Sequence, residues 1–181
     1  MLKKVLSEQF IITHKVSDLL KIDKKTLITN NIRNYVLEKR LSNEKWYSDY
    51  HYVDLQDHQH LAWVHDYIRD HYRIEYEETP ILIKRGGVVL LPNESLGSHH
   101  HIDDWDYEDS PEISVLYCLK EREKPSTVIF EYEFGRNKKR RWQVDLKEDT
   151  LIIFSSHLRH SISKNFNKDP IVALSFQFQL L

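Results

Sequence analysis

Residues 127–134 read Thr-Val-Ile-Phe-Glu-Tyr-Glu-Phe, and this stretch has the pattern of a half-buried β-strand. Successive side chains of a strand point to opposite faces, so Phe130 and Tyr132 share one face while Glu131 and Glu133 share the other. One apolar and one charged face are typical of an antiparallel sheet with one side against a core. The stretch therefore predicts a two-faced antiparallel strand.

The same kind of segment recurs throughout residues 80–181. Short runs rich in β-branched and aromatic residues are separated by turn-like or charged segments such as Gly86-Gly87. The runs are 81–83, 88–91, 113–119, 127–134, 142–146, 150–154 and 171–178. This density of short strands predicts a β-sandwich or barrel.

Residues 1–79 are predicted to be mostly helical. Within 30–40, Ile32 and Val36 lie at helical spacing, and 57–72 carries a second apolar stripe that includes Ile68. Helices that precede a sheet are expected to cover one of its faces. The expected fold class is α+β, mainly β, with 1–181 forming a single domain.

Composition excludes several classes of protein. The chain has 181 residues, a net charge of −2 and one cysteine, so no intramolecular disulfide or cysteine-based zinc cluster is expected. The near-neutral charge gives little drive toward nucleic acid, to which only the basic run 137–141 points, with a solvated turn as the plainer interpretation. The N-terminus lacks an apolar run of membrane-spanning length, so we expect a cytoplasmic protein without membrane contact.

Three adjacent histidines, His99 to His101, precede Ile102 and Asp103. Residues i and i+2 of a strand share a face, so His101 and Asp103 can bind one ion together. Two imidazoles and one carboxylate form the facial triad of non-haem iron(II) oxygenases, which leaves coordination positions open. His160, 57 positions after Asp103 and just after the apolar run 150–154, is the expected third ligand.

The C-terminal part of the chain resembles the iron(II)/2-oxoglutarate-dependent dioxygenases, most closely the prolyl-hydroxylase branch. The resemblance rests on four segments in the expected order. They are His101-Ile-Asp103, Ser114-Val-Leu-Tyr-Cys-Leu119, the run from Lys147 through Phe154-Ser-Ser to His160, and Ile171-Val-Ala-Leu-Ser-Phe-Gln-Phe178. It implies a double-stranded β-helix, or jelly-roll, core for residues 80–181.

The resemblance also implies a function. It points to a hydroxylase that uses Fe(II), held by His101, Asp103 and His160, with 2-oxoglutarate as cosubstrate and a protein side chain or small molecule as substrate. It assigns Tyr117 to the far carboxylate of 2-oxoglutarate, where Lys168 is the candidate point charge and Arg136, Arg140 and Lys164 are possible substitutes. The family's usual arginine is absent from residues 168–171, and an ammonium does not reproduce bidentate guanidinium recognition.

Two alternatives remain open. A cupin-like metalloenzyme that does not use 2-oxoglutarate would bind its ion through His99, His101 and His160. A non-catalytic jelly-roll module would instead use the basic run and the acidic segment 103–109 as partner surfaces. Metal affinities after replacement of His99 or Asp103 distinguish the first alternative from the facial triad.

Overall fold

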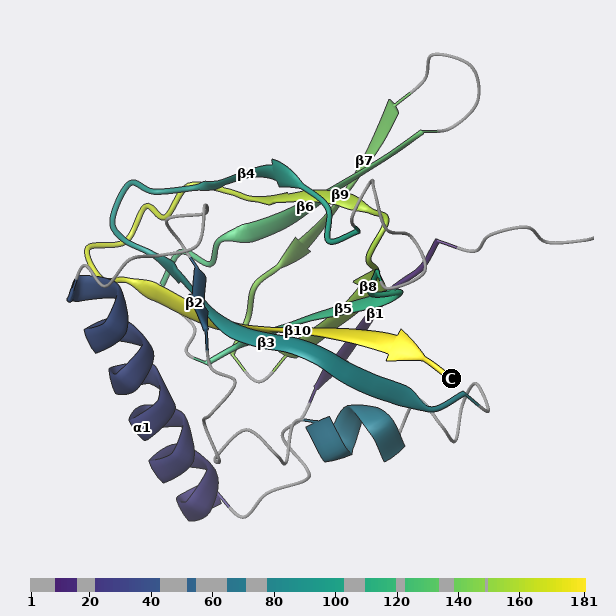
Figure 1. Cartoon of the computed structure of the whole chain (residues 1–181). Coiled ribbons are helices and arrows are strands. Elements are labelled where there is room, and N and C mark those ends of the chain that lie inside the picture. The colour runs from purple at the N-terminus through teal and green to yellow at the C-terminus, as the bar shows by residue number, and fades with distance from the viewer. Residues whose placement is uncertain are drawn as a thin grey trace, which may run out of the picture.

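The computed structural model describes residues 9–15, 22–42, 52–54, 65–70, 78–102, 110–119, 123–133, 139–148 and 150–181. It consists of two antiparallel sheets that face each other, with helical segments on the outer side of the larger one (Figure 1). The elements are β1 (Ile11–Lys15), α1 (Ile22–Leu41), β2 (Tyr52–Asp54), β3 (Pro80–Leu90), β4 (Leu96–His99), β5 (Ile113–Cys118), β6 (Thr127–Glu133), β7 (Lys139–Asp145), β8 (Thr150–Ser155), β9 (Arg159–Ile162) and β10 (Ile171–Leu180). The expected mainly β, jelly-roll fold is confirmed.

The larger sheet has the strand order β1-β8-β5-β10-β3-β2, and the smaller sheet has the order β4-β9-β6-β7. The smaller sheet and the inner face of the larger one enclose an apolar layer. Phe130 on β6 and Phe154 on β8 form its centre, with ring centroids 4.9 Å apart. Both rings are fully buried, so this layer joins the two sheets through the hydrophobic effect.

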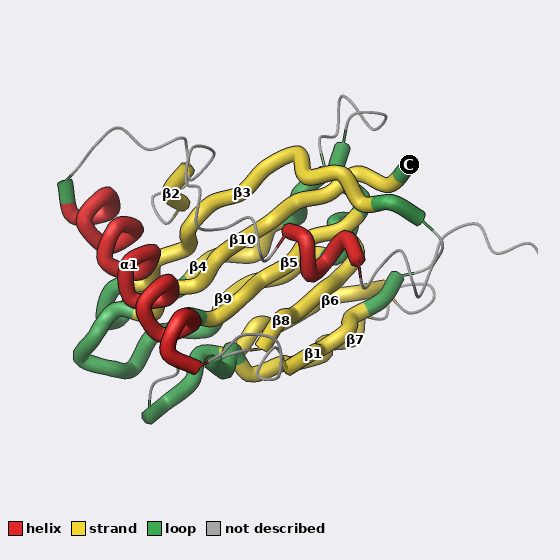
Figure 2. The backbone as a smooth tube through the Cα atoms, turned by 90° about the horizontal axis from the view of Figure 1, so that it is seen from below, coloured by secondary structure: helices red, strands yellow, loops and turns green. Residues whose placement is uncertain are grey.

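The outer face of the larger sheet carries a second apolar layer. Ile32 and Val36 of α1 and Ile68 of the helical segment 65–70 pack there against strand residues such as Val115 and Phe176. Figure 2 shows α1 and this second helical segment lying across the same sheet face. The prediction that N-terminal helices pack on one sheet is confirmed. The rest of the helix predicted at 57–72 lies outside the described residues.

Gly86 and Gly87 do not form the turn that the sequence predicts. β3 continues through both glycines. Gly87 lies directly beneath α1. A Cβ atom at position 87 would stand 2.5 Å from Cγ1 of Val36, which is closer than real carbon contacts. Glycine at this position therefore allows the helix to approach the sheet closely.

Residues 1–79 also contain strands that the sequence analysis missed. β1 pairs with β8 at one edge of the larger sheet, and β2 pairs with β3 at the other. Both strands are short, at five and three residues, so they carry little periodic signal. Part of the basic run 137–141 also lies in a strand, because β7 begins at Lys139. Arg141 forms an ion pair with Glu131 of the neighbouring strand β6 at 2.9 Å.

Candidate metal centre

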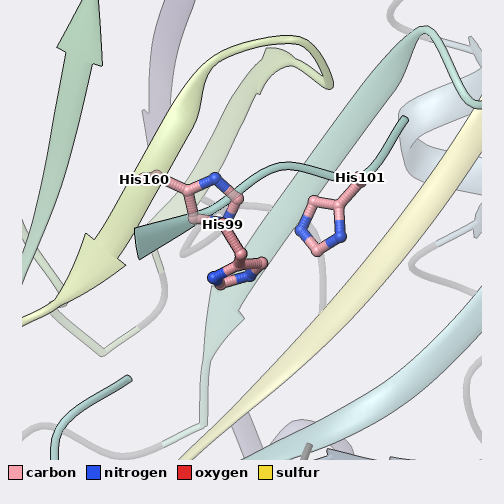
Figure 3. Close-up of side chains that lie close together, drawn as sticks. All are labelled: His99, His101 and His160. Atoms are coloured by element: carbon pink, nitrogen blue, oxygen red, sulfur yellow. The ribbon is translucent and has the colours of Figure 1, made fainter. Parts of the chain in front are cut away.

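Two neighbouring strands of the smaller sheet bring three histidines together. β4 pairs with β9 so that His99 stands opposite His160. β4 ends at His99, and His101 follows in a bend that its backbone N–H holds by donating to the carbonyl of Ser156, at 3.1 Å. Figure 3 shows the three side chains gathered at the end of β4.

The three rings lie close enough to share one ion. Ring centroids are 4.3 Å apart for His99 and His160, 4.9 Å for His101 and His160, and 5.0 Å for His99 and His101. One nitrogen from each ring lies within 4.8 Å of the other two. Ligands bound at about 2.1 Å from an ion stand about 3 Å apart when adjacent. Small ring rotations therefore close the site around a metal.

Hydrogen bonds orient two of these rings. Nδ1 of His160 lies 3.0 Å from the carbonyl oxygen of Leu158, and Nδ1 of His99 lies 2.9 Å from that of Gly97. Only a protonated Nδ1 can donate to a carbonyl, so each bond leaves the Nε2 lone pair free to bind a metal.

The third ring meets a side chain instead of a carbonyl. Nε2 of the Gln177 amide, on β10, lies 2.7 Å from Nδ1 of His101. Turning the amide by 180° brings its oxygen to the ring instead, so that Nδ1–H of His101 donates to it and Nε2 of His101 keeps its lone pair. Gln177 is largely buried and belongs to the larger sheet, so this bond ties both sheets to the site. The sequence analysis did not single out Gln177, because nothing local distinguishes it from other strand glutamines.

Burial keeps the imidazoles of His101 and His160 neutral. His160 is 1% exposed and packs against Phe154, with ring centroids 4.7 Å apart. This burial, with a smaller contribution from nearby His99, lowers the pKa of His160 to about 3. Burial likewise lowers the pKa of His101 well below its ordinary value, with smaller contributions from neighbouring charges that include Lys84. Neutral rings with available lone pairs are what metal ligation requires.

The structure therefore brings together His101 and His160, as predicted, and adds His99. Asp103 lies outside the described residues, so its role as a ligand stays a prediction. β4 ends at His99, four residues before Asp103, whereas the His-x-Asp argument placed His101 and Asp103 on one strand. His99 and His101 show the same spacing of two, and this is the sequence signal for the three-histidine arrangement.

The two residues assigned to the far carboxylate of 2-oxoglutarate lie elsewhere. Tyr117 belongs to the apolar layer under α1, while its neighbours Leu116 and Cys118 face the inner layer. Strand alternation thus directs Tyr117 away from the histidines. Lys168 is exposed on the loop before β10, at the strand end opposite Gln177. Their assignment to the far carboxylate of 2-oxoglutarate stays a prediction, because the resemblance gives strand positions without side-chain direction.

Comparisons with known proteins agree with the fold. No protein-family model matches the sequence, and no curated protein matches it significantly. A prolyl-4-hydroxylase from Pseudomonas putida is similar in structure, with a TM-score of 0.65 at 10% identity over 93% of this chain and 91% of that one. The viral collagen prolyl hydroxylase of Paramecium Bursaria Chlorella virus-1, in a complex with 2-oxoglutarate, gives 0.61 at 13% identity over 92% and 94%. HygX from Streptomyces hygroscopicus, with nickel and 2-oxoglutarate bound, gives 0.64 at 10% identity over 93% and 81%.

Proposed function

We propose that this chain is a non-haem iron(II) enzyme, a 2-oxoglutarate-dependent oxygenase that hydroxylates a C–H bond of its substrate. The observation that carries the proposal is the convergence of three imidazoles, of which burial keeps His101 and His160 neutral, at the inner face of a jelly-roll. The similar structures include enzymes described as prolyl hydroxylases and one with bound nickel and 2-oxoglutarate, which supports the same reaction class. A protein side chain is the favoured substrate, with a small molecule as the alternative.

The donor set fits the proposed metal. Imidazole nitrogen is a suitable ligand for iron as well as zinc, copper and nickel. His101 and His160 would each bind through one ring nitrogen and Asp103 through its carboxylate, and three ligands leave positions open for other molecules. Iron(II) with 2-oxoglutarate supplies the oxidising power to insert one atom of dioxygen into a C–H bond, and yields succinate and carbon dioxide.

The chain itself contributes orientation and exclusion of water. Carbonyl acceptors and the Gln177 amide hold the rings, so the ligand nitrogens are presented together. Phe130 and Phe154 fill the space behind His160, so water is excluded from that side of the site. Asp103, as the third ligand of this proposal, would reduce the charge of the loaded site by one.

A second candidate is a cupin-like metalloenzyme that does not use 2-oxoglutarate. The presence of His99 in the cluster favours it, because that enzyme would bind its ion through three histidines. Replacing Asp103 by Ala should leave metal affinity unchanged in this case, whereas replacing His99 by Ala should weaken it. The reverse order is expected if Asp103 is the ligand.

The proposal is tested by incubating the protein with iron(II), ascorbate and 2-oxoglutarate and measuring succinate. His160→Ala should abolish both metal uptake and succinate formation. His157→Ala is the matched control, since His157 is an exposed histidine of the same turn and should behave as the wild type. Absence of succinate from the wild type, or unchanged metal uptake by His160→Ala, would defeat the proposal. Candidate peptides are then compared by the extra succinate that each produces.

A further inference from the structure

The hairpin formed by β6 and β7 has an open strand edge. β7 lies at the end of the smaller sheet, and within the described part of the chain only β6 pairs with it. Figure 1 shows this hairpin projecting beyond the rest of the two sheets. Because a sheet edge with unpaired main-chain groups is a template for a further strand, β7 can accept an extended segment of another chain.

A hydrogen bond at the base of the hairpin shows which main-chain groups of β7 face the open edge. The N–H of Leu146 donates to the carbonyl of Ser126 at 2.8 Å. In an antiparallel pair such bonds recur at every second residue, so Val144 and Trp142 also bond to β6. Gln143, which lies between them, therefore directs its N–H and C=O groups to the open edge.

Trp142 is the large aromatic residue of this edge strand. It stands opposite Phe130 of β6, and Phe130 stands opposite His160 of β9. Cross-strand neighbours share a face, so Trp142 lies on the inner face, in one row with a candidate metal ligand. Its side chain is nevertheless 58% exposed. An aromatic ring open to solvent beside a free strand edge is typical of an interaction surface.

The charge of the hairpin favours an acidic partner. Residues 131–141 contain five cationic and two acidic side chains, which leaves a surplus of three positive charges. This surplus is what remains when Arg141 is matched with Glu131, at 2.9 Å, and Lys139 with Glu133 opposite it. A second copy of this chain would bring the same positive charges to the edge and be repelled, whereas an acidic segment is attracted.

A polypeptide fits this surface better than a nucleic acid does. The main-chain groups at the edge can pair with another main chain, as in the recognition of peptides by strand addition. A single-stranded nucleic acid needs a groove of continuous positive charge. The carboxylates of Glu131 and Glu133 interrupt the cations of the hairpin, and the whole chain has a net charge of −2.

We propose that the open edge of β7 and the ring of Trp142 dock an extended, acidic segment of the protein substrate. The inference rests on the proposed function and adds to it a docking site for the substrate. A strand added to β7 lies three strand spacings from β9, which is about 14 Å. Because an extended chain rises about 3.3 Å per residue, the docked segment is at least about four residues away from the residue that reaches His160.

The test measures the binding of three fluorescent probes to the full chain by anisotropy. The probes are a short peptide that alternates glutamate and valine, the same peptide with lysine in place of glutamate, and a short uridine oligonucleotide. The wild type should bind the acidic peptide at least about tenfold more tightly than either other probe. Added salt should weaken this binding, because it screens the attraction between the hairpin and the glutamates.

Two substitutions remove different parts of the docking site. Trp142→Ala removes the aromatic ring and should weaken binding of the acidic peptide by at least about tenfold. Gln143→Pro removes the N–H at the open edge, where an edge strand tolerates proline, and should weaken binding to a similar extent. Gln143→Ala keeps that N–H, and Phe166→Ala removes a ring that is 68% exposed on the loop before β10. Both controls should bind the peptide as the wild type does.

The outcomes separate the two proposals. The docking site is wrong if the wild type binds the acidic peptide no more tightly than the other probes, or if Trp142→Ala binds it as tightly as the wild type. Thermal unfolding shows whether Gln143→Pro is folded, and Trp142→Ala decides alone if it is not. Succinate formation without peptide binding would overturn the docking site only. Peptide binding by a wild type that forms no succinate would overturn the proposed function and leave β7 as a partner surface.

Discussion

The contact between Gln177 and His101 should control metal affinity, although Gln177 binds no metal itself. Replacing Gln177 by Leu removes the amide whose Nε2 lies 2.7 Å from Nδ1 of His101, and with it the oxygen that the turned amide offers to Nδ1–H. A buried donor without a partner costs about 1–3 kcal/mol, and the ring also loses its fixed orientation. Loss of such an orienting partner weakens metal binding by about ten- to hundredfold.

The conservative variant Gln177→Glu provides the matched comparison. A glutamate keeps the length of the side chain and an acceptor oxygen beside Nδ1, so cobalt(II) affinity should stay within about threefold of the wild type. Affinity is measured by competition with a chromophoric chelator, and thermal unfolding without metal shows whether each variant is folded. If Gln177→Leu is folded and binds cobalt(II) as tightly as the wild type, Gln177 does not orient His101 and the reasoning is refuted.

Three further predictions concern stability, measured by urea denaturation of the metal-free protein. Gly87→Ala would place a methyl group 2.5 Å from Cγ1 of Val36 and should lower the free energy of unfolding by about 1–3 kcal/mol. The control Gly97→Ala, whose methyl group would meet nothing within 4 Å, should change this free energy by less than about 1 kcal/mol. Equal effects of the two substitutions would contradict the close approach of α1. Asn165→Leu should lower the free energy of unfolding by about 1–3 kcal/mol, because the buried amide of Asn165 donates to two backbone carbonyls at 2.9 Å. An unchanged free energy of unfolding would show that these two hydrogen bonds do not stabilise the loop before β10. His160 has a pKa of about 3 in the folded chain and about 6.5 when unfolded, so the unfolded state binds more protons between these values and stability falls as the pH falls through this range. The loss from this group between pH 7 and pH 5 should be about 2 kcal/mol, and His160→Phe should lack that part of the pH dependence.

Much of the fold follows from local pattern. β6 was predicted from the alternation of aromatic and acidic residues, and Phe130 and Tyr132 do face the inner layer while Glu131 pairs with Arg141 on the other face. The turn predicted at Gly86-Gly87 was wrong. Gly87 instead leaves room for Val36 of α1, which lies more than fifty residues earlier in the chain. Local pattern cannot distinguish a glycine that turns the chain from one that makes room for a neighbour.

The candidate site was only partly predictable. His101 and His160 were identified from spacing and motif order, and the structure brings them together. Gln177 was not identified, because its contact with His101 depends on where the larger sheet places β10. Tyr117 was assigned from its position in a motif, and strand alternation turns it to the other face.

The sequence by itself determined which segments become strands and which residues can bind a metal, because periodicity and side-chain chemistry are local properties. Only the tertiary structure decided which of those residues meet. The pairing of β4 with β9 sets His99 opposite His160, and the pairing of β10 with β3 sets Lys84 beside Gln177. Register between distant strands depends on how both sheets bury their apolar faces together, and a one-residue shift would turn every one of these side chains to the other face.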